Sequence, residues 1–97
     1  MDAGYGIYAG DRPTWATLVF SSQAAQWVSR EEWHPRQTTR WLDDGNFELK
    51  LPYVNETELV MDVLRHGGQV RVIAPPSLFA TVNEQHRAAL RANGSDA

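Results

Sequence analysis

The chain has 97 residues, so we expect it to fold as one small domain. It has no cysteine, which excludes disulfides and thiolate metal sites, and its net charge of -3 argues against a freestanding nucleic-acid-binding protein with a basic face. No apolar run approaches the roughly 20 residues that span a bilayer, and no secretory signal is visible, so we expect a cytoplasmic protein without a membrane partner.

The chain begins with a segment that lacks regular periodicity. Residues 1–14 contain three glycines and a proline, which is typical of a linker. Aromatic and β-branched residues then alternate between two faces in Trp15–Phe20. This pattern predicts a strand with Ala16, Leu18 and Phe20 on one face.

A helix is predicted directly after this strand. A serine pair offers an N-cap, and Ala24, Trp27 and Val28 recur at helical spacing. We therefore expect Trp27 to lie in the core. Because Pro35 disfavours helical backbone at the residue before it, the helix must end by residues 33–34.

A hairpin is predicted in the middle of the chain. Residues 37–42 form a polar, β-branched run, and residues 43–46, with the sequence DDGN, favour a tight turn. Residues 47–51 alternate between apolar and charged side chains, as in a half-buried strand. We expect Pro52 to end this strand or to mark an edge.

The remainder of the chain predicts a helix, a strand and a second helix. Asn55 is the expected N-cap of the first helix and Gly67 its C-terminal glycine. Residues 69–74 alternate as a strand, and Ser77 is the expected cap of a last helix that ends near residue 91. The predicted apolar positions of the two helices are Leu59, Val60, Val63 and Leu64, then Leu78, Phe79, Val82, Ala89 and Leu90.

The predicted element order indicates the fold class. A βαββαβ order with a central hairpin suits an α+β, ferredoxin-like sandwich, in which a four-stranded antiparallel sheet carries both helices on one face, here followed by a C-terminal helix. The other sheet face would be left open. The alternation places these residues on it: Thr17, Val19, Glu48, Lys50, Arg71 and Ile73. Since that face mixes apolar and charged side chains, we expect it to be a contact surface.

Several motifs follow one another in a fixed order along residues 16–90. They are an apolar strand (Leu18, Phe20), a helix with alanine and an aromatic residue (Ala25, Trp27), a W-H-P-x-Q motif (Trp33, His34, Pro35, Gln37), a hairpin (Asp44, Gly45), a helix ending in glycine (Val63, Leu64, Gly67) and a strand ending in proline (Pro75). This series resembles the C-terminal extension (WCX) domain of bacterial WYL-domain transcriptional regulators. One departure is Arg36, which stands where the family usually has serine.

The resemblance implies a longer protein. Residues 1–14 would form the exit from a preceding WYL domain, residues 15–92 the WCX domain, and residues 93–97 a disordered tail. In such regulators a winged helix-turn-helix holds the DNA, and the WYL domain is the usual candidate sensor. The extension is implied in dimerisation and in shaping the effector site.

We therefore expect a non-catalytic regulatory domain. It would form a homodimer, support effector sensing and reach DNA only through the missing domain, with no cofactor or metal. Nucleotides and single-stranded nucleic acid are its candidate effectors. The alternative is a ligand-binding module that holds a small molecule or single-stranded nucleic acid on the open sheet face. An enzyme is disfavoured because no nucleophile–base pair, metal set or phosphate loop is recognisable.

The W-H-P-x-Q motif is interpreted as structural, through Trp33, His34, Pro35 and Gln37. As a general base, His34 would need a nucleophile in reach, and as a metal ligand it would need two or three partners; the sequence supplies neither. We instead expect a helix-terminating corner whose polar side chains bind nearby backbone.

Five further side chains are candidate ligand or partner contacts: Arg36, Arg40, Arg71, Trp15 and Trp41. Arginine can hold an anion through two parallel hydrogen bonds, and an exposed indole can stack on a base. The competing interpretation is surface ion pairs for the arginines, and core or dimer contacts for the tryptophans.

Overall fold

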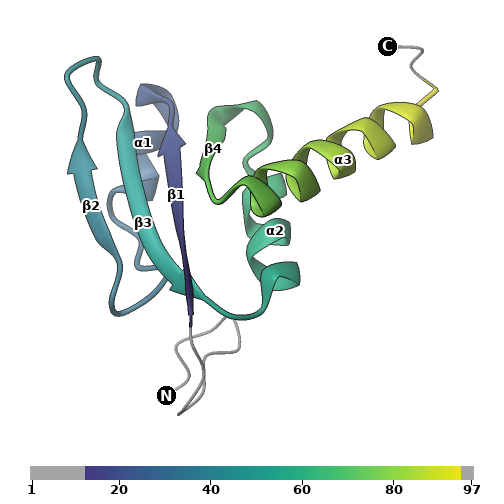
Figure 1. Ribbon diagram of the computed structural model, residues 1–97. Coiled ribbons are helices and arrows are strands. Elements are labelled where there is room, and N and C mark those ends of the chain that lie inside the picture. Colours follow the sequence, from purple (N-terminus) through teal and green to yellow (C-terminus); the bar gives the residue numbers. More distant parts are fainter. Residues whose placement is uncertain (1–12, 95–97) are drawn as a thin grey trace.

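The computed structural model describes residues 13–94. The predicted linker and exit segment falls outside this range up to residue 12, as do residues 95–97 of the predicted tail. The elements are β1 (Thr14–Phe20), α1 (Ser22–Val28), β2 (Thr38–Trp41), β3 (Phe47–Tyr53), α2 (Glu56–Arg65), the 3-10 turn η1 (Gly67–Gln69), β4 (Val70–Ala74) and α3 (Pro76–Ala92) (Figure 1).

The four strands form one sheet in the order β2-β3-β1-β4, and every neighbouring pair is antiparallel. This order follows from the sequence of elements, because each helix carries the chain past a central strand before it returns to the sheet. The four-stranded antiparallel sheet, with three helices and an α+β composition, confirms the predicted ferredoxin-like class. β1 and β3 are the central strands, and β2 and β4 are the edges.

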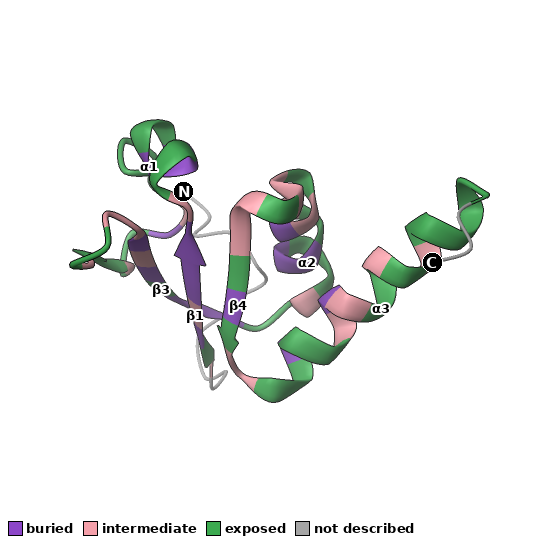
Figure 2. Cartoon of the chain, turned by 90° about the horizontal axis from the view of Figure 1, so that it is seen from above, coloured by how far each residue is buried: buried purple, intermediate pink, exposed green. Residues whose placement is uncertain are grey.

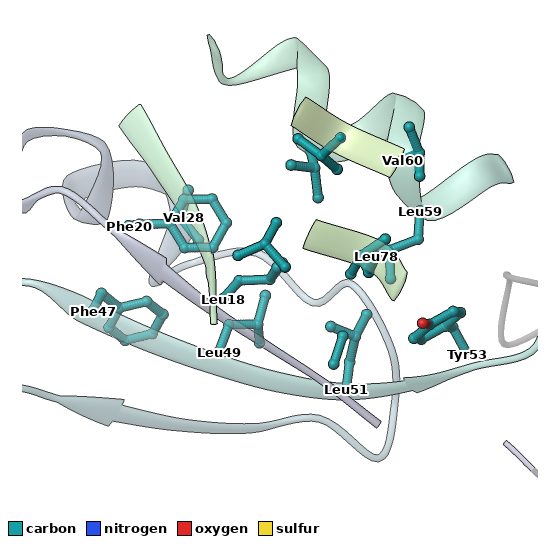
Figure 3. Close-up of a cluster of buried hydrophobic side chains, with 14 of the residues drawn as sticks. Leu18, Phe20, Val28, Phe47, Leu49, Leu51, Tyr53, Leu59, Val60 and Leu78 are labelled. Carbon is teal, nitrogen blue, oxygen red and sulfur yellow. The ribbon is translucent and has the colours of Figure 1, made fainter. Parts of the chain in front are cut away.

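The core lies on one side of the sheet, where alternate residues of the central strands meet the helices (Figure 3). The register pairs Leu18 with Leu49 and Phe20 with Phe47, so their side chains share one face. α1 and α2 both cover this face (Figure 2). They contribute Ala24, Ala25, Val28, Leu59, Val60 and Val63, and α3 adds Leu78 and Val82.

α1 is shorter than the spacing pattern suggested, and one prediction about it is wrong. It ends at Val28, and the residues that it buries are Ala24, Ala25 and Val28. Trp27, expected in the core, is 46% exposed. Ala24, Ala25 and Val28 occupy one arc of a helix with 3.6 residues per turn, and Trp27 lies outside that arc. The small alanines let α1 approach the sheet closely.

The hairpin forms as predicted, but its second strand runs further than expected. Gly45 adopts a positive φ of 88°, which closes the turn. β3 continues through Pro52 to Tyr53, so Pro52 neither ends the strand nor lies on an edge strand. The ladder tolerates it because β2 pairs only as far as Lys50, so β3 has no neighbour on that side at Pro52.

α2 has the caps that the sequence indicated. The Asn55 side-chain oxygen accepts hydrogen bonds from the backbone N–H groups of Thr57 (3.0 Å) and Glu58 (3.5 Å). At the other end, Gly67 has a φ of +56°, the left-handed conformation expected after a helix C-cap. The caps fix where α2 begins and ends, and therefore how its buried stripe faces the sheet.

α3 starts two residues earlier than predicted, and Ser77 does not cap it. Pro75 is the N-cap and Pro76 occupies the first turn, where a missing N–H costs nothing. Ser77 lies within the helix, and its side chain is hydrogen-bonded to that of Tyr53. The start of α3 packs against β4 and α2, and its C-terminal half extends away from the sheet (Figures 1 and 2).

Candidate functional site

The Trp33–Gln37 loop follows α1 and is held together by one side chain. The Gln37 Oε1 atom accepts the backbone N–H groups of Trp33 (2.6 Å) and His34 (3.1 Å). Its Nε2 atom donates to the carbonyl of Glu31 (3.2 Å), and its own backbone N–H donates to the carbonyl of His34 (3.0 Å). These hydrogen bonds therefore close the loop around Gln37.

His34 is buried in this loop, with only 2% of its surface exposed. Its Nδ1 atom accepts the backbone N–H of Arg36 at 2.9 Å, so the proton of the neutral imidazole is on Nε2. Nε2 is buried and has no hydrogen-bond partner within residues 13–94. Burial lowers the pKa of His34, the Arg36 charge lowers it further, and the Glu32 carboxylate opposes both. His34 is therefore a buried imidazole held in its neutral form, and the lone pair of its Nδ1 atom is engaged by the Arg36 backbone.

Trp33 connects the loop to the core and to the end of α2. Its ring meets Phe20 edge-on at a centroid distance of 5.5 Å and stacks on His66 at 5.6 Å. The indole N–H donates to the Glu31 carboxylate at 2.9 Å. A polar hollow of about 490 Å³ lies beside this cluster, lined by Glu31, Glu32, Trp33, Asp62 and Arg65.

Arg36 contributes to the loop through its backbone. Its N–H reaches His34, while its side chain is exposed. A backbone donor is present whatever the side chain, so the serine usual in the family is not required for this hydrogen bond. Arg36 belongs to the loop before β2, whereas Arg40 and Arg71 belong to strands of the sheet.

Two of the candidate arginines lie in one row across the open side of the sheet. Arg40 is opposite Glu48, Glu48 is opposite Val19, and Val19 is opposite Arg71. Arg40 forms an ion pair with Glu48 at 3.4 Å. Arg71 has no ion pair within residues 13–94. The row therefore has a neutralised cation at the β2 edge and an unpaired one at the β4 edge.

The two candidate tryptophans lie on opposite sides of the sheet. Trp15 is opposite Pro52 on the open face and is 42% exposed. Trp41 is opposite Phe47, on the core side, where its ring meets that of Phe47 edge-on at 4.9 Å. It remains 58% exposed because β2 is an edge strand. The structure thus brings Trp15, Arg40 and Arg71 to one face and leaves Arg36 and Trp41 elsewhere.

Two features escaped the sequence reasoning. The sequence patterns gave His66 no structural role, yet it stacks on Trp33 and meets Phe20 edge-on at 5.2 Å. Its position just before the helix-ending Gly67 was the available signal, because the chain there turns back toward the sheet. Ile73 and Phe79 also line one common hollow, which periodicity alone could not show since they belong to different elements.

Comparison with known proteins supplies the family. The WCX domain model matches residues 12–90. The protein PafC of Mycobacterium tuberculosis, in strains CDC 1551 / Oshkosh and ATCC 25618 / H37Rv, is 31% identical over 86 residues. That alignment covers 89% of this chain but only 27% of PafC, so the chain spans about a quarter of the relatives' length.

These similarities support a regulatory domain of a WYL-type regulator. No helix within residues 13–94 is long and apolar enough to cross a membrane. The match covers most of the chain and agrees with the motif order that the sequence carries. The chain belongs to the WCX domain family.

Proposed function

We propose that this chain is a non-catalytic regulatory and dimerisation domain of a WYL-type helix-turn-helix regulator, and that it supports effector sensing while a preceding winged helix binds DNA. The observation that carries the proposal is the WCX match over residues 12–90. The small share of PafC that the alignment covers agrees with the domain being one part of a longer protein. The native protein would act in the cytoplasm.

The protruding half of α3 is the surface that we propose for dimerisation. Asn83, His86 and Leu90 follow one another at spacings of three and four residues and therefore share one stripe of the helix. Leu90 is 45% exposed, although it is large and apolar. A second copy that covered this stripe would remove the Leu90 side chain from water.

The charged residues of α3 leave this stripe free. Glu84 pairs with Arg87 at 3.5 Å and with Arg91 at 3.4 Å, so these charges are compensated along the same helix. At 3.6 residues per turn they lie on the side of α3 away from Leu78 and Val82. A partner on the Asn83–Leu90 stripe would therefore not need to desolvate them.

Size-exclusion chromatography with light scattering, at micromolar concentration, tests the dimer. We expect the mass of two chains for the wild type and of one chain for Leu90→Glu, because the new carboxylate would be buried in the contact. Met61→Glu is the matched control, since Met61 is also an exposed apolar residue, 65% exposed, but lies on α2. A wild-type monomer, or equal weakening by both variants, would contradict the proposal for α3.

A second candidate function is ligand binding on the open sheet face. The observations that favour it are the unpaired Arg71 and the exposed ring of Trp15 on the same face. An indole there could stack on a base while arginine meets a phosphate. This candidate concerns a different surface from the α3 stripe.

Tryptophan fluorescence measured during titration with a short single-stranded DNA at low salt tests this second candidate. We expect quenching in the wild type and its loss in Trp15→Phe. Trp27→Phe is the control, because Trp27 is similarly exposed but lies on α1. A flat titration, or quenching that survives in Trp15→Phe, would contradict nucleic-acid stacking on this face.

A further inference from the structure

Arg71 lines two different hollows at the β4 edge of the sheet. One is polar, has a volume of about 330 Å³ and is lined by Val19, Ser21, Asn46, Gly68, Gln69, Val70 and Arg71. The other is mainly apolar, has a volume of about 550 Å³ and is lined by Arg71, Val72, Ile73, Pro76 and Phe79. Figure 1 shows the neighbouring positions of β4 and the start of α3 that form the second hollow. Arg71 therefore borders both a polar hollow and an apolar one.

The polar hollow presents hydrogen-bond donors. The Ser21 hydroxyl donates to the side-chain oxygen of Gln69, which leaves the Gln69 amide N–H₂ group available. Asn46 already donates, through its backbone and its side chain, to the Asp44 carboxylate. The side-chain donors that a ligand would meet at the β4 edge are the Gln69 amide and the Arg71 guanidinium. They suit one acidic group.

Two large apolar side chains, Ile73 and Phe79, line the apolar hollow and remain partly exposed to solvent. Ile73 is 50% and Phe79 48% exposed. Ile73 sits where the β1–β4 register shifts, so β4 carries one extra residue and its side chain is turned out of the regular ladder. Phe79 comes from the first turns of α3. Exposed apolar residues that gather from two elements are a feature of binding surfaces.

We propose that the Arg71 region binds a small amphiphilic anion: one carboxylate on Arg71 and Gln69, joined to an apolar body that covers Ile73 and Phe79. The inference rests on the second candidate function, ligand binding by this domain, and names the chemistry of the ligand. Its site is the β4 edge and not the Trp15 region. A flat oligonucleotide titration therefore rejects nucleic-acid stacking without touching this site.

Charge and shape both select this class of ligand. Among the described residues that line either hollow, Arg71 is the one cation, which matches a single acidic group better than a polyphosphate chain. An uncharged apolar compound would leave Arg71 unused, and a plain inorganic anion would leave Ile73 and Phe79 in water. Since both apolar side chains stay half open, we expect weak binding that needs both contacts together.

Backbone amide NMR of the whole ¹⁵N-labelled chain, titrated with octanoate below its micelle-forming concentration, tests the site. We expect saturable shifts at the amides of residues 69–73 and 77–80. Acetate and 1-octanol are the matched probes, because each carries one half of the octanoate chemistry. We expect each to bind at least threefold more weakly, the size of effect that one exposed charge contact or one half-buried apolar group gives.

Two variants separate the contributions of charge and apolar surface. Arg71→Gln should weaken octanoate binding about threefold or more and leave 1-octanol binding unchanged, whereas Phe79→Ala should weaken both. Arg30→Gln, an exposed arginine that lines neither hollow, should change nothing. Equal affinity for octanoate and 1-octanol, undiminished octanoate binding by Arg71→Gln, shifts that map elsewhere, or no shifts at all would each overturn the proposal.

Discussion

Gln37 holds the loop after α1 with a single amide group. Its oxygen accepts two backbone N–H groups and its nitrogen reaches a third backbone group, so three main-chain partners depend on one side chain. Pro35, two residues before Gln37, has no backbone N–H to donate. These hydrogen bonds explain how a motif of Trp, His, Pro and Gln forms a compact corner after α1.

Replacement of Gln37 by alanine should therefore destabilise the domain by about 1–3 kcal/mol, because it strands the N–H groups of Trp33 and His34. Urea unfolding followed by tryptophan fluorescence measures this. Arg36→Ser is the matched control within the same loop. It should change the free energy of unfolding by less than about 0.5 kcal/mol, since only the backbone of Arg36 is used. A cost for Arg36→Ser as large as that for Gln37→Ala would refute this account.

The buried His34 makes a prediction about pH. Its pKa is lowered in the folded chain, chiefly by burial, so the unfolded chain binds more protons than the folded one as pH falls. The stability due to the neutral imidazole is thus fully present above the unfolded pKa of about 6.5 and is lost as pH decreases toward the lower folded value. Below the pKa of His34 in the folded chain, protonation of this residue causes no further loss of stability.

His34→Asn tests this linkage, because asparagine can still accept the Arg36 N–H but does not titrate. We expect the free energy of unfolding of the wild type to fall more steeply between pH 7 and the acid side than that of the variant. Parallel pH profiles for the two proteins would show that His34 does not carry the dependence. The comparison cancels the contributions of the carboxylates, which both proteins share.

At the scale of elements, α3 is divided into a packed half and a protruding half. Leu78 is fully buried and Leu90 is 45% exposed on the same helix. Leu78→Ala should cost about 2–5 kcal/mol, because it removes core contacts and leaves a cavity. Leu90→Ala should cost less than about 0.5 kcal/mol at concentrations where the chain is monomeric. Thermal or urea unfolding of the pair measures the difference, and similar losses would place Leu90 in the core.

The elements also show where sequence patterns reach their limit. Within residues 13–94, the sequence patterns predicted each β-strand and α-helix but not the 3-10 turn η1. The Asn55 and Gly67 caps and the Gly45 turn follow from local backbone chemistry alone. The prediction that Trp27 lies in the core was wrong. Helical spacing shows which residues share one side of a helix, but it does not show which side packs against the sheet. The prediction for Pro52 was wrong because a proline fits inside β3 only where the neighbouring strand has ended. Where β2 ends is set by strand pairing, which the sequence pattern does not show.

At the scale of the whole molecule, topology was more predictable than the site. The order of elements constrained the sheet to β2-β3-β1-β4, since short connections and crossovers admit few arrangements. The row from Arg40 to Arg71 depends on register, and the hollow between Ile73 and Phe79 depends on how α3 leaves the sheet. Neither is encoded in the spacing of residues along one element.

The same topology predicts how stability is distributed over the domain. β1 and β3 have neighbours on both sides and supply most of the sheet's buried side chains, whereas all four residues of β2 are exposed. Amides that open only by global unfolding exchange most slowly. We therefore expect the slowest hydrogen exchange in β1 and β3, faster exchange in β2, and the fastest among regular elements in the last turns of α3.

Hydrogen exchange read by NMR at two protein concentrations measures this pattern and adds information about association. In dilute solution the amides near Leu90 should exchange far faster than those near Leu78. At high concentration a dimer through α3 should slow exchange near Leu90 and leave β2 unchanged, because only surfaces covered by the partner gain protection. Slow exchange in β2 as well as β1 would contradict the predicted distribution, and concentration-independent exchange near Leu90 would contradict the contact through α3.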